Sequence, residues 1–145
     1  MLHIIRTIED PLINFVLHDP VRPEIPITWR IEDNNEVFTL VDESNVPQAI
    51  VCVAYRDSIP SSVDELFFKE NSEPTSAIFY TIWSYSPGAG RQLITQVQSY
   101  LKESCKHITR YVTLSPTTEI AKKFHLKNGA IIYRQNDSTV NYEYK

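Results

Sequence analysis

The stretch covering residues 77–101 constrains the fold more than any other part of the sequence. Residues 77–84 (AIFYTIWS) are apolar or β-favouring throughout, which is typical of a central strand buried on both faces. The chain has only 3 glycines, and two of them, Gly88 and Gly90, follow this run directly. The next apolar residues share one helical face: Leu93, Ile94, Val97 and Leu101. The pattern predicts a buried strand, a tight glycine turn and an amphipathic helix.

The rest of the chain alternates between strand-like and helix-like segments. Further strands are predicted at residues 36–41, 49–55, 109–114, 131–135 and 139–144, the last two forming a hairpin. Further helices are predicted at residues 9–17, 62–68 and 116–128. This order indicates an α/β fold with a mixed sheet, and the length of 145 residues is typical of a single domain spanning residues 1–145.

A proline-rich segment separates the first predicted helix from the first strand of this sheet. Pro20, Pro23 and Pro26 recur at three-residue spacing, and proline removes a backbone donor and restricts the preceding residue. The segment is therefore predicted to be extended, without regular helix or central strand.

Composition excludes several classes of protein. The hydrophobic content of 42% is enough for a core, and no apolar run is long enough for a membrane span or a signal peptide, so we expect a cytoplasmic protein without membrane contact. Cys52 and Cys105 lack the spacing of metal ligands and are expected to be free thiols, and no metal is expected. The net charge of −4 argues against a nucleic-acid-binding protein.

The charge is divided unequally along the chain. Residues 1–85 hold 5 Lys and Arg against 14 Asp and Glu, whereas residues 86–145 hold 9 against 4. The first part therefore carries −9 and the second +5. A basic half is suited to an anionic ligand and an acidic half to a cationic one, although solvated surface charge is the simpler interpretation of any single residue.

The glycine turn has two interpretations. The first turn of a helix presents unpaired N–H groups and partial positive charge, and phosphates bind there when glycine lets them approach the backbone. Gly88 and Gly90 satisfy this requirement, and Arg91 adds a charged side chain. The dinucleotide fingerprint fails because position 93 is Leu, and the Walker ending is absent. The alternative is a turn that only packs the helix against the strand.

The third glycine, Gly129, adds a second motif. Residues 85–90 (YSPGAG) and residues 121–130 (AKKFHLKNGA) together resemble two motifs of the GNAT superfamily of acyl-CoA-dependent acyltransferases. In that family a glycine turn follows the fourth strand, and a later helix has the pattern Asn-x-x-Ala-x-x-Leu-Tyr-x-x-x-Gly. All three glycines match family glycine positions, while Tyr85, Thr118 and His125 depart from the usual Gln or Arg, Asn and Tyr.

This resemblance implies a fold, a ligand and a set of binding residues. The fold would be a GNAT-like mixed sheet of about six or seven strands, flanked by helices and splayed between strands four and five. The ligand would be acetyl-CoA or another coenzyme A thioester, as co-substrate. The pyrophosphate would be held by Ser86, Pro87, Gly88, Ala89, Gly90 and Arg91, and the pantetheine arm by the strand edge at Thr81, Ile82 and Trp83. Thr118 replaces a further binding residue of the family.

The resemblance also suggests catalytic residues. His125 stands where the family often has a tyrosine that protonates the departing thiolate, and a histidine suits that role because its pKa lies near neutrality. Tyr133 is a second candidate donor, and a surface histidine without function is the competing interpretation. For a general base the sequence offers carboxylates without placing them: Asp42, Glu43, Asp57 and Glu119. The resemblance also allows direct attack by the amine, with a chain of water molecules as the base.

Three functions are compatible with these motifs. The first is an acyltransferase, most simply an N-acetyltransferase, acting on a small-molecule or peptide amine that binds around residues 9–35 and the final hairpin, with Trp29 either lining the pocket or buried. The second is a module that binds acyl-CoA without catalysis. The third is activity like that of malonyl-CoA decarboxylase, whose GNAT-like domain uses Ser and His, because Thr113-Leu114-Ser115-Pro116 is followed by His125. Edge strands near residues 131–144 also make a homodimer a reasonable expectation.

Overall fold

The computed structural model describes residues 1–68 and 73–145 of the chain. The helices are α1 (Ile13–Val16), α2 (Ile27–Arg30), α3 (Val63–Leu66), α4 (Ala89–Ser104) and α5 (Glu119–Lys127). The strands are β1 (Leu2–Ile5), β2 (Asn35–Val41), β3 (Pro47–Arg56), β4 (Ser76–Ser84), β5 (Arg110–Thr113), β6 (Ser115–Pro116), β7 (Ile131–Gln135) and β8 (Thr139–Tyr144). Together they form a mixed α/β fold.

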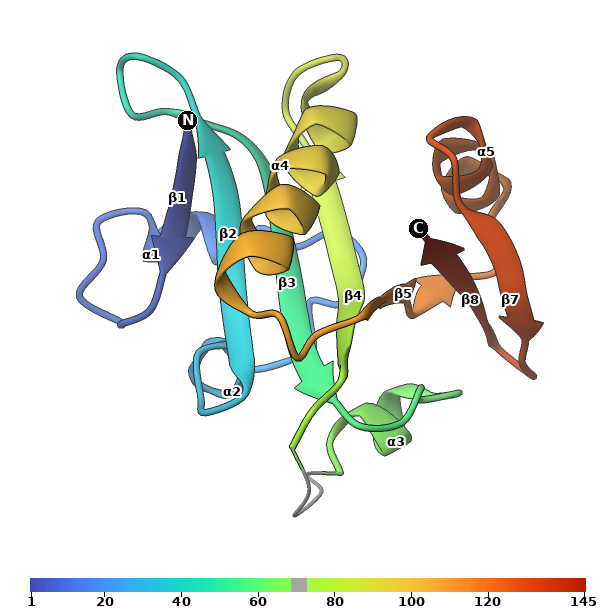
Figure 1. Ribbon diagram of the computed structural model, residues 1–145. Helices are drawn as coiled ribbons and strands as arrows, with labels where there is room; N and C mark the ends of the chain where they lie inside the picture. The colour runs from blue at the N-terminus through green and yellow to red at the C-terminus, as the bar shows by residue number, and fades with distance from the viewer. Residues whose placement is uncertain (69–72) are drawn as a thin grey trace.

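One sheet of eight strands runs through the molecule (Figure 1). Strands β1 to β5 lie side by side in chain order, β8 pairs with β5 and β6, and β7 pairs with the other edge of β8. Every pairing is antiparallel except that of β4 with β5, which α4 connects as a crossover helix. The predicted α/β class, mixed sheet and splay after the fourth strand are therefore confirmed.

The N-terminal third differs most from the prediction. The helix predicted at residues 9–17 is a single turn, α1, because the Asp10 carboxylate accepts a hydrogen bond from the Leu12 N–H and holds the preceding residues in a turn. The extended segment contains a helical turn, α2, which begins directly after Pro26, where a fixed φ favours a helix start. The short strands β1 and β6 were not predicted, which raises the strand count above six or seven.

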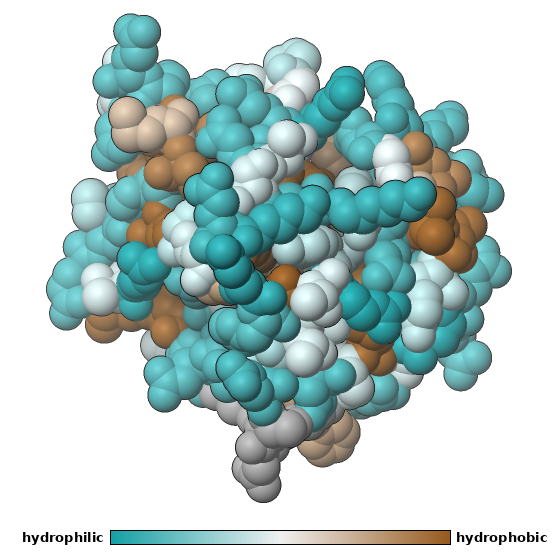
Figure 2. Space-filling view, in the orientation of Figure 1, coloured by the Kyte–Doolittle hydropathy of each residue, from teal (hydrophilic) through white to brown (hydrophobic). Residues whose placement is uncertain are grey.

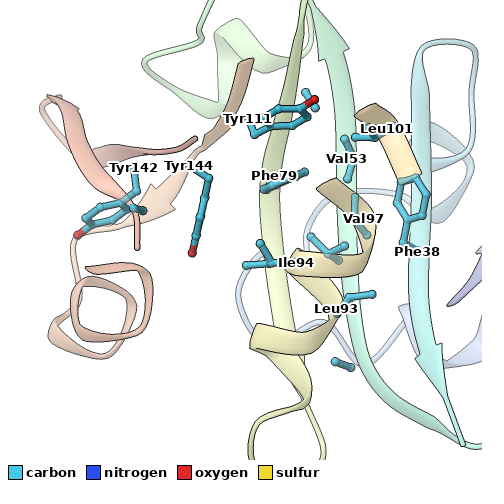
Figure 3. Close-up of a cluster of buried hydrophobic side chains, with 14 of the residues drawn as sticks. Phe38, Val53, Phe79, Leu93, Ile94, Val97, Leu101, Tyr111, Tyr142 and Tyr144 are labelled. Carbon is cyan, nitrogen blue, oxygen red and sulfur yellow. The ribbon is translucent and has the colours of Figure 1, made fainter. Parts of the chain in front are cut away.

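The face of the sheet that carries α4 is an ordinary apolar core. Four residues of α4 point at the sheet, as their helical spacing predicts: Leu93, Ile94, Val97 and Leu101. They pack on Phe38, Val53 and Phe79, from three neighbouring strands (Figure 3). Burial of such side chains contributes about 1.5–3 kcal/mol each to folding. The strand–turn–helix unit is thus held in place by hydrophobic packing.

The opposite face is covered by the irregular N-terminal segment rather than by a long helix. Leu12, Val16 and Ile25 from this segment pack on the second apolar cluster, together with residues of β3 and β4. Three arginines are also buried here: Arg22, Arg30 and Arg56. Trp29 contacts the rings of Tyr80 and Phe67, so it belongs to this core.

The sheet divides where β4 passes β5. The β4–β5 ladder pairs only residues 76–79 with residues 110–113, although β4 continues to Ser84. On its other edge, β4 has a bulge, since Phe79 and Thr81 pair with the consecutive residues Val53 and Cys52. An extra residue bends a strand. The β5–β8–β7 part of the sheet, with α5, therefore diverges from the second half of β4 (Figure 1).

The surface of the protein is mixed in character. The face seen in Figure 2 is largely hydrophilic, with apolar groups scattered among polar ones. Within residues 1–68 and 73–145, no helix has the length and hydropathy required to cross a bilayer.

Candidate functional site

A cavity lies in the gap between the two parts of the sheet. Its volume is about 320 Å³, and it is lined by residues 79–84 of β4, residues 114–116, four residues of α5, Thr118, Gly90, and Pro20 with Val21 of the N-terminal segment. It exists because β4 loses its neighbour beyond Phe79 and the two strands separate. None of the described lining residues has a charged carboxylate, ammonium or guanidinium group.

Half of the predicted site residues line this cavity and half do not. Those that line it are Thr81, Ile82, Trp83, Gly90, Thr118 and His125. Ser86, Pro87, Gly88, Ala89 and Arg91 lie in the turn before α4 and in its first turn, next to Gly90. Tyr133 lies elsewhere, on β7, where its half-exposed ring stacks on the Arg110 guanidinium at 4.7 Å. The geometry thus gathers the β4 edge and His125 into one site and leaves Tyr133 outside it.

The two glycines of the turn serve different purposes. Gly88 is the N-cap of α4 and has φ 79°, a left-handed conformation that favours glycine. Gly90 has ordinary helical geometry, but a Cβ at this position would lie 3.1 Å from the ring of Phe124 on α5. The first turn of α4 therefore closely approaches α5 at one end of the cavity, and N–H groups of this turn have no helical partner.

His125 is a buried, uncharged imidazole. Its ring stacks on Tyr142, with centroids 5.0 Å apart, and Nδ1 lies 2.6 Å from the Tyr144 hydroxyl (both tyrosines are labelled in Figure 3). Burial lowers the pKa of His125 to about 4 and raises the pKa of Tyr144. At neutral pH the Tyr144 hydroxyl keeps its proton and can donate it to Nδ1, which assigns the ring proton to Nε2. Nε2 makes no hydrogen bond with any described residue.

This protonation state changes the chemistry expected of His125. The sequence suggested a general acid with a pKa near neutrality. A pKa of about 4 means that an imidazolium is rare at pH 7. Instead, the neutral Nε2–H group is a hydrogen-bond donor on a residue that lines a cavity of low polarity, where a hydrogen bond is stronger than in water.

Ser115 is a polar cavity residue that sequence reasoning named only within a tetrapeptide. It is buried, and its Oγ donates to Thr113 Oγ1 at 2.8 Å. Thr113 Oγ1 also accepts from the Tyr142 N–H at 3.0 Å. Because hydroxyl protons rotate, the Thr113 hydroxyl can instead donate to Ser115, which frees the Ser115 O–H for a ligand. The Leu-Ser-Pro run that precedes α5 was the only sequence signal for this residue.

The remaining predicted residues have local structural contacts. The Thr118 hydroxyl caps α5 by accepting from the Ala121 N–H at 3.2 Å. Tyr85 lies beside the site, where its hydroxyl accepts a hydrogen bond from Trp83 Nε1. None of the carboxylates considered as a base lies among the described lining residues: Asp42, Glu43, Asp57 and Glu119.

No protein-family model and no curated protein matches the sequence. Solved structures do match. A malonyl-CoA decarboxylase from Rhodopseudomonas palustris superposes with a TM-score of 0.75 at 17% identity, over 99% of this chain and 59% of that one. A second, from Agrobacterium vitis, is 23% identical with a TM-score of 0.69, over 86% of this chain and 35% of that one. The chain thus spans between about one third and three fifths of the length of these decarboxylases.

Acetyltransferase structures match over nearly their whole length. A Bacillus subtilis acetyltransferase in complex with CoA gives a TM-score of 0.67 at 12% identity and covers 99% of this chain and 97% of that one. With the parallel β4–β5 pairing, the separation of these strands and the glycine turn before α4, the comparison places the chain in the GNAT fold class. Identities this low show the fold and leave the reaction to be inferred from the site.

Proposed function

We propose that the chain binds a coenzyme A thioester in the cavity beside β4 and decarboxylates a malonyl-type acyl group. The observation that carries this proposal is that Ser115 and His125 line one cavity whose described walls hold no charged side chain. The likeness to malonyl-CoA decarboxylases supports it. These are also the two residue types that the resemblance noted in the sequence associates with that activity.

The cavity and α4 together suit the shape of the ligand. The N–H groups of the first turn of α4, with Arg91, would bind the pyrophosphate, as helix N-termini do. The free edge of β4 at Thr81–Trp83 would pair with the amides of the pantetheine arm. The thioester would then enter the cavity that Ser115 and His125 line. The positive charge of residues 86–145 favours this orientation of the anionic end.

Decarboxylation of a malonyl thioester requires hydrogen-bond donors to the enolate oxygen and an apolar environment for the carboxylate. The bond between the carboxyl carbon and the α-carbon breaks, and its electron pair moves onto the α-carbon and the thioester oxygen, giving an enolate and CO₂. The Nε2–H of His125 and the hydroxyl of Ser115 would donate to the enolate oxygen. The α-carbon then takes one proton from solvent to give the acetyl thioester. An apolar cavity favours loss of the carboxylate because CO₂ is uncharged.

Acyl transfer to an amine is the second candidate. The match to a CoA-bound acetyltransferase over nearly the full length of both chains favours it. An acceptor amine must lose a proton before it attacks, however, and the described walls of the cavity offer no carboxylate for this step. Decarboxylation requires no such base, and we therefore place it first.

One series of assays distinguishes the candidate functions. The protein is incubated with malonyl-CoA, and CO₂ and acetyl-CoA are quantified by gas release and chromatography. We expect both products in equal amounts, and a loss of turnover of about 100-fold in Ser115→Ala and in His125→Gln. The matched controls, Ser138→Ala and His107→Gln, change exposed residues and should keep the wild-type rate.

Other outcomes would redirect the assignment. Free thiol released from acetyl-CoA with an amine panel, without CO₂ from malonyl-CoA, would establish the transferase instead. Binding of both thioesters without turnover would identify a silent module. If neither thioester raises the melting temperature, the cavity is not a coenzyme A site and all three functions fail.

A further inference from the structure

Arg22 occupies the point where β4 and β5 separate. The last backbone hydrogen bond between these strands runs from the Leu114 N–H to the Phe79 carbonyl, at 3.0 Å. Just beyond this bond, the guanidinium of Arg22 connects the two strands through the carbonyls of Tyr80 and Leu114. Nε donates to the Tyr80 carbonyl at 3.2 Å and Nη2 to the Leu114 carbonyl at 2.9 Å. Both Tyr80 and Leu114 line the cavity, so the guanidinium lies next to the part of the wall that these two residues form.

A second arginine and one carboxylate fix Arg22 in place. Asp19 Oδ1 accepts from the Arg22 N–H at 2.9 Å and from the Thr81 hydroxyl at 3.0 Å. Asp19 Oδ2 pairs with Arg30 Nη1 at 2.7 Å, and Arg30 Nη2 donates to the Arg22 carbonyl at 2.7 Å. All three charged side chains are buried. The segment that forms the cavity wall at Pro20 and Val21 is therefore rigidly held.

This cluster has one more positive than negative charge. Asp19 offsets one guanidinium, and the neighbouring thiol of Cys52 stays neutral because burial raises its pKa to about 11. The charge of Glu24 acts on the Arg22 guanidinium more than that of Asp19 does, but it lies outside the buried cluster, on an exposed side chain that solvent screens. Nη1 of Arg22 makes no hydrogen bond with a described residue. Unbalanced buried charge is costly unless an anion joins it.

We propose that Arg22 is a specificity-determining residue, which selects coenzyme A thioesters whose acyl group ends in a carboxylate. The inference rests on the proposed binding of a thioester beside β4. With the pyrophosphate at the first turn of α4, the acyl group reaches the wall formed by Tyr80, Leu114 and Val21, behind which Arg22 lies. The described lining residues carry no charge, and Arg22 is a buried cation hydrogen-bonded to two of them. The acyl group stays anionic through decarboxylation, because the enolate keeps the negative charge of the carboxylate. Arg22 therefore attracts both species.

The test compares an anionic acyl group with a neutral one of the same shape. Malonyl-CoA and acetoacetyl-CoA differ by a carboxylate oxygen in place of a methyl group. Their dissociation constants are measured by rapid mixing, from the tryptophan fluorescence that Trp83 in the cavity wall should report, before turnover occurs. We expect the wild-type protein to bind malonyl-CoA about tenfold more tightly, since one charge several ångströms away in a partly polar medium has an effect of this order.

Two variants separate charge from structure. Arg22→Lys keeps the charge and should keep most of the preference. Arg22→Met removes the charge and should abolish the preference, while the affinity for acetoacetyl-CoA stays within about twofold. Arg6→Met, at an exposed arginine, is the matched control and should leave both affinities unchanged. If Arg22→Met binds both thioesters more weakly by the same factor, Arg22 has a structural role only and the proposal is overturned.

The outcome does not depend on whether the protein is a decarboxylase. Equal affinities of the two thioesters for the wild-type protein overturn the inference even if CO₂ is released. A preference for malonyl-CoA that Arg22→Met removes upholds it even if no CO₂ is released, in which case the proposed reaction alone fails. If Arg22→Met does not fold, the ratio of the two dissociation constants in the wild-type protein and in Arg22→Lys still tests the proposal. Loss of the preference in Arg22→Lys would contradict a role for the charge.

Discussion

The two faces of the sheet bury polar groups in opposite ways. On the face covered by the N-terminal segment, Asp19, Arg22 and Arg30 remain charged and are held by one another and by backbone carbonyls. On the face covered by α4 and α5, the buried basic side chain is His125, which burial keeps neutral. Each face therefore has its own point of weakness: the first depends on keeping its charges paired, and the second on keeping its imidazole uncharged.

The difference follows from the backbone that each face carries. Apart from its first and last turns, helix α4 satisfies its own N–H and carbonyl groups, so the side chains that face the sheet need only be apolar. The N-terminal segment has only two single-turn helices, and the Arg30 side chain donates to two of its carbonyls, those of Arg22 and Ile25. Buried charge thus replaces regular secondary structure as the means of satisfying the backbone.

The largest expected effect comes from breaking the charged cluster. Asp19→Ala removes the partner of Arg30 and the acceptor of the Arg22 and Thr81 hydrogen bonds. An uncompensated buried charge costs about 3–5 kcal/mol, so we expect the free energy of unfolding to fall by about that amount. Equilibrium urea denaturation measures it.

The control for this variant is Asp33→Ala, at an exposed carboxylate, which should change stability by less than about 0.5 kcal/mol. A loss below about 1 kcal/mol in Asp19→Ala would mean that the N-terminal face does not depend on its ion pair.

The second expected effect concerns the neutral imidazole on the other face. His125 has a pKa of about 4 in the folded protein and an ordinary value of 6.5. Between these values the unfolded chain binds a proton that the folded protein does not, so stability falls as the pH drops from 6.5 to 4. The loss is on the order of 3 kcal/mol. The difference between wild-type and His125→Gln stability, measured by denaturation at several pH values, isolates this contribution from that of the carboxylates.

Equal pH slopes of the two proteins in this window would show that His125 titrates normally, and would remove the contrast between the faces. Above pH 6.5 the slopes should coincide, because the imidazole is neutral in both the folded and the unfolded state.

The smallest effect distinguishes the two glycines of the turn. Gly88→Ala forces a left-handed φ on alanine and should cost about 1–2 kcal/mol, with little change at the cavity. Gly90→Ala places a methyl group 3.1 Å from the Phe124 ring, which lines the cavity. We expect a cost of about 1 kcal/mol and altered binding of malonyl-CoA. Thermal denaturation measures the loss of stability, and titration with malonyl-CoA measures binding. Identical binding by the two variants would contradict separate roles for the two glycines.

The predictability of the fold follows the same division between the faces. The strand–turn–helix unit and α5 could be predicted because their apolar residues recur at helical or strand spacing and their caps are local. The N-terminal segment could not, because α2 and its surroundings are fixed by Arg30 and Asp19, whose partners lie in loops and on distant strands. The four-residue strand β1 is too short to show a period, and β2 alone pairs with it.

The candidate site was predictable only where a motif coincided with a wall of the cavity. The β4 edge and His125 came from the resemblance to the GNAT motifs. The neutral state of His125 came from burial against Tyr142 and Tyr144, which lie on a strand that follows it in the chain. The position of Arg22 between two carbonyls depends on a bulge at Tyr80 that has no sequence signature.

The separation of β4 from β5 also has a consequence for amide exchange. Alternate N–H groups of residues 81–84 face the cavity and have no strand partner on that side. They lie next to fully paired amides of the β3–β4 ladder, so slow and fast hydrogen–deuterium exchange should alternate along one strand. A thioester paired with this edge would slow the fast set alone. Exchange along β4 therefore gives a residue-by-residue record of how far into the protein its ligand extends.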